Sequence, residues 1–221
     1  MSEPASSSAA ARDGARADYF SNHTVKLKFP WSLYHAPIVE SAAAVLRGAR
    51  GHEVLNIGAG PFFELERLDA SGRRFTICDI DPRAMEAARE LHGHRIERAD
   101  VVEPGAPLPY ADESFDVVLS MDVIEHVAPP MPWLKEAWRV TRPGGTLFLT
   151  TPNYGSRSLR VLERTVLEAL ARVQGFTRKD IHPTKFDERR LVGALDAIGA
   201  ARARVRAIAF GWVLTATVKN P

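Results

Sequence analysis

Cysteine, long apolar runs and clustered basic residues are all scarce in this 221-residue sequence. The single cysteine, Cys78, can form no internal disulfide and cannot by itself build a metal site, so we expect a small core residue. No uninterrupted apolar stretch reaches the roughly 18 residues that a membrane span needs. There is no Lys/Arg run and no interleaving of basic and aromatic residues. These absences favour a protein with neither a membrane span nor a nucleic-acid partner.

Residues 1–18 are rich in Ala and Ser and contain few apolar side chains. They lack the basic and then apolar order of a secretory signal, so we expect a disordered tail on a cytoplasmic protein. Residues 19–221 suffice for a single α/β domain with a substantial core. The sequence does not predict the oligomeric state.

Short apolar runs alternate with helical patterns along most of the chain. This alternation predicts an α/β fold of the doubly wound, Rossmann-like type, with a mostly parallel sheet and helices on both faces. Two β-rich runs on either side of Phe210-Gly211-Trp212 indicate a hairpin at the C-terminal end. We expect strands at residues 53–57, 74–78, 95–98, 115–120, 146–150, 204–209 and 213–218, and helices at 36–47, 63–68, 82–91, 131–140 and 188–198.

The first two strands end in residues suited to a nucleoside. The apolar run 54–57 breaks into Gly58-Ala59-Gly60, and the two glycines allow a tight turn and a close approach of the backbone to a ligand. The second strand ends at Asp79, which follows Gly58 by roughly the 20 residues that separate the turn of a βαβ unit from its ribose-binding carboxylate. A helix cap is the alternative role for Asp79, but Asp81 is better placed to cap the following helix.

A nicotinamide dinucleotide is one candidate ligand. Its fingerprint G-x-G-x-x-G requires a third glycine for close packing of helix on strand. That position holds Phe63, after Pro61 and Phe62. A turn this crowded suits a ligand without a pyrophosphate, although an oxidoreductase remains an alternative.

Further segments follow in a fixed order. Residues 108–121 read LPYADESFDVVLSM, residues 122–127 read DVIEHV, and residues 137–149 read AWRVTRPGGTLFL. With the glycine turn and Asp79, these segments resemble the class I S-adenosylmethionine-dependent methyltransferases over about residues 53–153. The DVIEHV segment is similar to the E-x-x-EH pattern of the ubiquinone-type branch. Two departures from the family pattern are Asn56, where Asp is common, and Phe62, where a further Gly is common.

The resemblance implies S-adenosylmethionine as the cofactor and a mainly parallel sheet completed by a C-terminal antiparallel strand. It places the methionine part of the cofactor over the glycine turn and the ribose on Asp79. The adenine is expected between Ile80 and Val101, with Asp100 taking its amino group. Because ligands of open α/β sheets bind at the carboxyl ends of the strands, the predicted cofactor residues are Gly58, Ala59, Gly60, Asp79, Ile80, Asp100, Val101 and Met121.

His126 is the candidate catalytic residue. It follows the fourth predicted strand, and an imidazole with its ordinary pKa near ~6.5 can remove a proton from an acceptor at neutral pH. In a second interpretation, Glu125 and His126 only fix the loop after the strand. A third is a metal site of Asp122, Glu125 and His126, but Asp122 is shorter than the usual Glu. We therefore predict no metal ion.

Two variable segments are expected to contact the acceptor. Residues 19–35 are dense in aromatic side chains and suggest a lid over the cofactor, with Tyr19, Trp31 and Tyr34 as candidates; anchoring to the core is the alternative. Residues 153–187 form an insertion that contributes Tyr154 and His182. His182 opens an H-x-x-x-F element similar to one in methyltransferases of glycan and polyprenyl pathways.

The charge is distributed unevenly. Residues 151–221 hold 13 Lys and Arg against 6 Asp and Glu, whereas residues 1–150 hold 16 against 21. A basic region near the site would favour an anionic acceptor, although solvated surface arginines explain the same excess. The sequence thus predicts methyl transfer to oxygen or nitrogen of a small molecule. A non-catalytic S-adenosylmethionine-binding scaffold or regulatory protein is the alternative.

Overall fold

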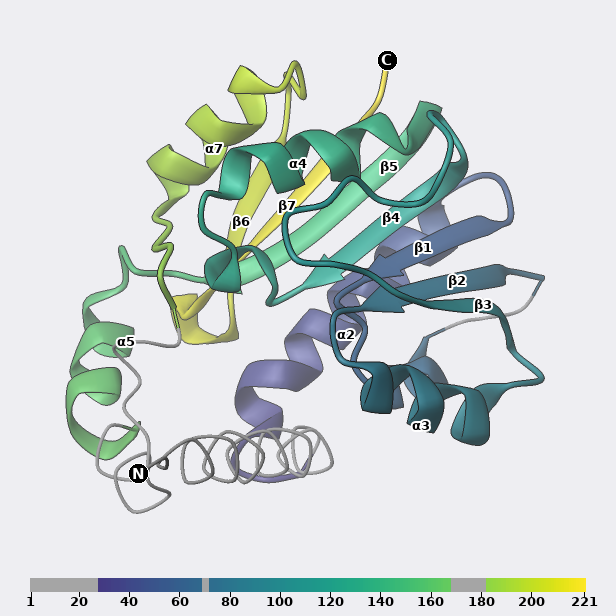
Figure 1. Cartoon of the computed structure of the whole chain (residues 1–221). Helices are drawn as coiled ribbons and strands as arrows, with labels where there is room; N and C mark the ends of the chain where they lie inside the picture. The colour runs from purple at the N-terminus through teal and green to yellow at the C-terminus, as the bar shows by residue number, and fades with distance from the viewer. Residues whose placement is uncertain (1–27, 69–71, 168–181) are drawn as a thin grey trace, which may run out of the picture.

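The computed structural model describes residues 28–68, 72–167 and 182–221, and its centre is a twisted seven-stranded sheet (Figure 1). The strand order is β3-β2-β1-β4-β5-β7-β6. All strands run parallel except β7, which is antiparallel to both of its neighbours. The strands are β1 (Glu53–Ile57), β2 (Arg74–Asp79), β3 (Ile96–Val101), β4 (Phe115–Met121), β5 (Thr141–Pro152), β6 (Arg204–Ile208) and β7 (Val213–Lys219).

The doubly wound architecture predicted from the sequence is confirmed. The expected C-terminal hairpin also forms, and its second strand is inserted between β5 and β6. Strand β5 is longer than predicted because Thr141 already pairs with Phe115 before the Pro-Gly-Gly turn. The central strands are almost entirely buried, which is why they appear in the sequence as nearly continuous apolar runs.

Helices cover both faces of the sheet and divide the core into two layers. On one face, α4 (Pro130–Arg139) and α7 (Glu188–Ala197) pack over side chains such as Leu55 and Val118. On the other, α2 (Ser32–Gly48) and α3 (Pro82–His92) pack over neighbouring strand residues such as Val54 and Val117. The alternation between adjacent residues follows from the two-residue period of a strand.

Shorter elements connect these layers. They are the 3₁₀ turns η1 (Phe63–Arg67), η2 (Ile124–His126) and η5 (Ala209–Gly211), the helix α5 (Arg157–Leu162) and the π-helical turn η3 (Glu163–Leu167). In the sequence, the spacing of Leu159, Leu162, Val166 and Leu170 predicts one amphipathic helix in the insertion of residues 153–187. Within the described part, α5 ends at Leu162, and Leu170 lies outside the described residues. None of the helices described is long and apolar enough to cross a membrane.

The Asp of the Ser-Phe-Asp sequence in the 108–121 motif is Asp116, and its carboxylate has a structural role. Oδ2 of Asp116 accepts hydrogen bonds from the backbone amides of His52 and Glu53, at 2.8 and 2.9 Å, and Oδ1 contacts Arg142 at 3.1 Å. This contact fixes the start of β1 against β4. It also requires glycine at position 51, where a Cβ would stand 2.2 Å from Cγ of Asp116.

We therefore expect Asp116→Ala to lower the free energy of unfolding by about 1.5 to 3 kcal/mol, the range for hydrogen bonds to a charged group. Urea unfolding measures the change. Asp112→Ala is the matched control in the same motif, because the Asp112 side chain is 75% exposed in its ion pair with Arg139. The control should change stability by less than about 1 kcal/mol. Equal losses in the two variants would contradict this role.

Candidate functional site

Four parallel strands end at one edge of the sheet and carry the predicted cofactor residues there. Gly58 follows β1, Asp79 ends β2, Val101 ends β3 and Met121 ends β4. The register places Asp79 beside Val101, and Gly58 donates its backbone amide to the Cys78 carbonyl at 2.8 Å. The structure thus brings residues separated by more than 60 positions together at the carboxyl ends of neighbouring strands.

The glycine turn has the backbone that its sequence predicts. Gly58 and Gly60 have positive φ angles of 68° and 56°. A Cβ at Gly58 would lie 2.4 Å from Cγ2 of Val123, so a side chain there is excluded sterically as well as by the backbone angle. Between these glycines, Ala59 is 8% exposed.

Phe62 departs from the glycine that relatives commonly have, yet it keeps a glycine-like backbone. Its φ is 57° and its ψ is 43°, in the left-handed region. The ring is fully buried and lies 5.6 Å from the ring of Phe75. Burial of an aromatic side chain offsets the cost of a left-handed angle, which explains how Phe is accommodated at this position.

Asp79 is fixed by two backbone amides. Its Oδ2 accepts from Gly60 at 2.8 Å, and its Oδ1 accepts from Asp81 at 3.0 Å. The carboxylate therefore links the glycine turn to the end of β2. Asp81 itself caps α3 by accepting from the Arg83 amide at 3.0 Å, as the sequence predicted. With capping done by Asp81, the Asp79 carboxylate is oriented toward the turn over which a ligand would lie.

The two residues predicted to sandwich the adenine are large apolar side chains at the surface. Ile80 is 61% exposed and Val101 is 51% exposed. Asp100 lies between a cation and a phenol: its Oδ2 accepts from Arg98 Nε at 2.8 Å and from the Tyr110 hydroxyl at 3.0 Å. Met121 is half-buried. The predicted adenine region thus combines two exposed apolar side chains with a carboxylate that is held by two partners.

Cys78 lies on β2, next to Tyr110. The thiol is fully buried, and burial raises its pKa to about 12. Burial also raises the pKa of Tyr110, whose hydroxyl donates to Asp100. Cys78 is a core residue, as the sequence predicted.

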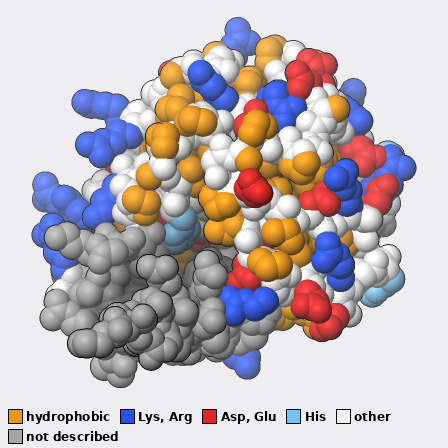
Figure 2. All heavy atoms as spheres, viewed as in Figure 1, with side chains coloured by type: hydrophobic (Ala, Val, Ile, Leu, Met, Phe, Trp, Pro, Cys, Tyr) orange, Lys and Arg blue, Asp and Glu red, His pale blue; other side chains and the backbone are white. Residues whose placement is uncertain are grey.

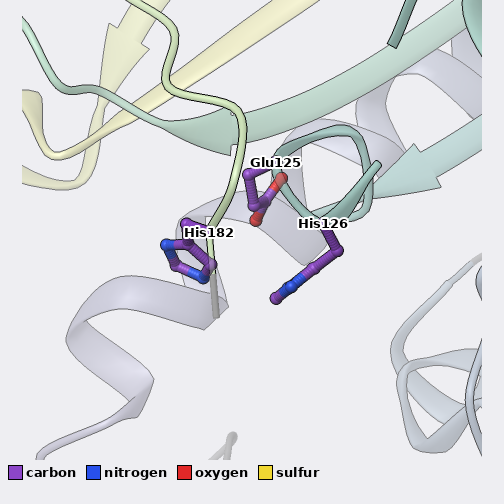
Figure 3. A group of neighbouring side chains, drawn as sticks. All are labelled: Glu125, His126 and His182. Carbon is purple, nitrogen blue, oxygen red and sulfur yellow. The ribbon is translucent and has the colours of Figure 1, made fainter. Parts of the chain in front are cut away.

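The other half of the site lies beyond β4 and comes from two segments that are far apart in the sequence (Figure 3). Glu125 and His126 belong to η2, and His182 begins the segment that leads into α7. The rings of His126 and His182 lie 4.8 Å apart in an edge-to-face arrangement. Glu125 is 1% exposed, His182 is 8% exposed and His126 is exposed.

The H-x-x-x-F element explains how His182 reaches this position. Phe186 is buried, and its carbonyl accepts from the Tyr154 amide at 2.8 Å. Thr184 donates its amide to the Glu125 carbonyl at 3.1 Å and its hydroxyl to the Val127 carbonyl at 2.6 Å. The element is thereby attached to the residues that follow β5 and to η2. Sequence reasoning missed these contacts, because nothing in either segment specifies the other as its partner.

Tyr154 and His182, which were both predicted to contact the acceptor, are hydrogen-bonded to each other. The Tyr154 hydroxyl lies 2.6 Å from Nδ1 of His182 and 3.3 Å from Glu163. Lys185 Nζ lies 5.3 Å from the centre of the Tyr154 ring. This side of the site therefore combines an ordered phenol with a positive charge.

Asp122 does not join the two residues with which it was grouped as a possible metal site. Its Oδ1 accepts from the Thr150 hydroxyl at 2.7 Å, and its amide donates to the Thr150 carbonyl at 3.2 Å. Among the described residues, the side chains close enough to share an ion are instead Glu125, His126 and His182. The sequence did not predict that His182 would lie in this group, because it follows His126 by 56 positions.

Of the predicted lid, only the last part can be placed. Tyr19 lies outside the described residues. Trp31 and Tyr34 are found at the beginning of α2, where Trp31 is 38% exposed and the Tyr34 ring packs edge-on against His35 at 4.9 Å. Figure 1 shows the first turns of α2 extending past the carboxyl ends of the strands, on the side where α5 lies. Their contact with an acceptor stays a prediction.

Comparisons with known proteins agree on a family. A protein-family model described as a methyltransferase domain matches residues 55–149. A methyltransferase of Mycobacteroides abscessus is 38% identical over 142 residues, which are 62% of this chain and 54% of that protein. The chain spans about half the length of the curated relatives it matches, or less.

Two solved structures share the fold at low sequence identity. An S-adenosylmethionine-dependent methyltransferase from Aquifex aeolicus has a TM-score of 0.62 and 16% identity, covering 89% of this chain and 93% of that one. The second is the 1,6-didemethyltoxoflavin-N1-methyltransferase of Burkholderia thailandensis, which was solved with 1,6-didemethyltoxoflavin and S-adenosylhomocysteine bound. It has a TM-score of 0.63 and 16% identity, and the match covers 100% of this chain and 93% of that one. Residues 55–149 therefore match the methyltransferase-domain family, and the chain shares its fold with S-adenosylmethionine-dependent methyltransferases.

The buried position of Cys78 gives a direct test of the packing of β2. At pH 8, a thiol with a pKa of about 12 is ionised to only about one part in 10⁴. Ellman's reagent should therefore react with Cys78 roughly 10³-fold more slowly in the native protein than in guanidinium chloride. Because the chain has one cysteine, the absorbance change reports on this residue alone. Rapid reaction of the native protein would show that β2 is not packed as described.

Proposed function

We propose that this chain transfers a methyl group from S-adenosylmethionine to an oxygen or nitrogen of a small, anionic acceptor. The observation that carries the proposal is the convergence of the glycine turn, Asp79 and the exposed pair Ile80 and Val101 at one edge of the sheet. Each of these features suits a different part of the cofactor. The side-chain-free backbone of the turn suits the methionine part, the Asp79 carboxylate suits the ribose diol, and the apolar side chains of Ile80 and Val101 suit the adenine.

The residues present fit this cofactor. Gly58 and Gly60 keep the turn free of side chains, and Asp79 is oriented by two amides while its remaining lone pairs can accept from hydroxyls. Asp100, fixed by Tyr110 and Arg98, is placed to accept from an amino group. When bound, S-adenosylmethionine supplies an electrophilic methyl group, so the protein's task is chiefly to align the acceptor and remove its proton.

The acceptor side supports an anionic small molecule. Lys185 lies over the Tyr154 ring, and Arg189 and Arg190 follow closely in the exposed first turn of α7. Figure 2 shows Lys and Arg side chains gathered on the side of the molecule where α7 lies. A positive potential there attracts carboxylates or phosphates. The Burkholderia protein, whose acceptor is a small molecule, is consistent with this class.

His126 is our proposed residue at the reacting group of the acceptor. It lies on η2, directly after the strand that ends at Met121, and its exposed ring is within reach of an acceptor that also contacts His182. The sequence assigned it the role of general base. A cytoplasmic location and the lack of a nucleic-acid partner likewise stay predictions from composition.

Calorimetry with S-adenosylhomocysteine separates this proposal from its alternatives. A methyltransferase binds this product with a 1:1 ratio and turns over at least one member of an acceptor panel. Binding without turnover on any acceptor would favour a scaffold or regulatory protein. Absence of binding at millimolar ligand would overturn both, and preference for a nicotinamide dinucleotide would revive the oxidoreductase despite the crowded turn at Pro61, Phe62 and Phe63.

Asp79→Ala tests the predicted ribose contact. We expect the variant to bind S-adenosylhomocysteine about 1.5 to 3 kcal/mol more weakly, because it loses hydrogen bonds to a charged group. Asp81→Ala is the control: it should cost about 1 kcal/mol of stability through the lost helix cap, with little change in affinity. Calorimetry measures affinity, and circular dichroism checks that both variants fold. Unchanged affinity in Asp79→Ala would show that another acid binds the ribose.

A further inference from the structure

We propose that Tyr110 and Arg98 are positioning residues that make this site select a 6-amino purine over a 6-oxo purine, by holding the Asp100 carboxylate in one orientation. Arg98 and Asp100 lie on β3, whereas Tyr110 lies in the segment between β3 and β4. The sequence gave no reason to join these three side chains. The inference rests on the proposed function, because it concerns how the adenine of the cofactor is recognised.

Both partners of Asp100 bond to the same oxygen. The Tyr110 hydroxyl donates to Oδ2 at 3.0 Å, and Nε of Arg98 lies 2.8 Å from the same Oδ2. Two donors that approach one oxygen from different segments restrict rotation of the carboxylate about its side-chain bonds. In this orientation, Oδ1 is the oxygen that we assign to the amino group of the adenine.

Tyr110 is itself held in place by the core. It is 9% exposed, and its ring packs edge-on against Phe115 with 5.2 Å between the ring centres. Its hydroxyl is also hydrogen-bonded to the thiol of Cys78, the β2 residue that pairs with Asp100 in the sheet. Since burial raises the pKa of Tyr110, the hydroxyl keeps its proton and stays a donor at neutral pH.

Arg98 holds the carboxylate from the solvent side. Its side chain is 53% exposed, whereas that of Asp100 is only 22% exposed. The guanidinium carbon lies 5.3 Å from the centre of the Tyr110 ring, in a cation–π contact. The positive charge offsets part of the cost of removing the carboxylate from water. Each of the three side chains therefore contacts the other two.

The selection follows from the chemistry of the carboxylate, which accepts hydrogen bonds and cannot donate them. Adenine has an amino group at purine position 6, which donates, whereas hypoxanthine has a carbonyl oxygen there. Two acceptors that face each other leave both without a partner, and this costs free energy in a partly buried site. A carboxylate that cannot turn away keeps this penalty, so the site rejects the 6-oxo base.

The neighbouring apolar side chains cannot supply this selection. Ile80 and Val101 are the exposed residues expected on the two sides of the base. Contacts with the faces of a purine are nearly the same for adenine and hypoxanthine, because the two bases differ at the ring edge. The preference for the amino group is therefore a property of Asp100 and the two residues that hold it.

Calorimetry with two ligands tests the proposal. S-adenosylhomocysteine has the 6-amino group, and S-inosylhomocysteine has a carbonyl oxygen in its place. We expect wild-type protein to bind the first about 10- to 150-fold more tightly, which corresponds to one hydrogen bond to a charged group. The ratio of the two dissociation constants is the informative quantity, because a general effect on the site changes both constants and leaves their ratio unaltered.

Three substitutions should lower this ratio. Tyr110→Phe removes only the hydroxyl, and Arg98→Met removes the charge while it keeps an apolar stem. Each should lower the ratio at least about threefold, because the carboxylate regains its rotation. Arg98→Lys, which retains the charge, should preserve more of the ratio than Arg98→Met. Asp100→Asn should bring the ratio close to one, since an amide can donate to the carbonyl of the 6-oxo base.

Arg74→Met is the matched control. Arg74 begins β2, at the opposite end of the sheet from the predicted cofactor residues, and forms an ion pair with Glu53. Its side chain is 61% exposed, close to the 53% of Arg98, and the ratio should not change in this variant. Circular dichroism checks that each variant is folded. Slow reaction of Cys78 with Ellman's reagent shows that Tyr110→Phe keeps the local packing.

Three results would overturn the positioning role. They are a wild-type ratio close to one, an unaltered ratio in folded Tyr110→Phe and Arg98→Met, and an equal decrease of the ratio in Arg74→Met. Each leaves the proposed function standing, because the protein still binds S-adenosylhomocysteine. Failure of wild-type protein to bind either ligand would instead overturn the proposed function.

Discussion

The parallel pairing of β1 with β2 and β4 is the constraint on which the rest of the site depends. It sets the end of β1 beside the ends of its neighbours, so the glycine turn and Asp79 meet at a bond of 2.8 Å between the Gly60 amide and Oδ2 of Asp79. Asp116 holds the opposite end of the same pair by accepting from two amides at the start of β1. The carboxylates of Asp79 and Asp116, one at each end of β1, thus help to fix its register against β2 and β4.

The acceptor side depends on a second, independent attachment. The segment from His182 to Phe186 is joined to η2 through Thr184 and to the start of the insertion through Phe186 and Tyr154. The predicted cofactor contacts thus lie at the strand ends, whereas the predicted acceptor contacts lie in loops that the sheet supports. This division is common in α/β proteins, because a rigid sheet can keep its ligand while the loops change specificity.

Predictions of strands and helix caps succeeded where the signal was local. β1 was predicted with its observed bounds, because an apolar run ending in Gly58 specifies both a buried strand and its end. Asp81 was identified as the cap of α3 from its place before Pro82. The prediction failed where distant partners decide: β5 extends to Thr141 because Phe115 pairs with it, and the helix after Ser156 changes to a π turn at Glu163.

The sequence by itself determined the doubly wound fold, the order of its strands and helices, and which residues stand at the strand ends. These features follow from hydrophobic period, glycine and proline placement, and short motifs, all of which act over a few neighbouring residues. Only the tertiary structure decided that His182, and not Asp122, lies with Glu125 and His126. The reason is physical: Asp122 accepts a hydrogen bond from Thr150 on the neighbouring strand, whereas the hydrogen bonds of Thr184 to Glu125 and Val127, 57 or more positions away, hold the His182 segment beside η2.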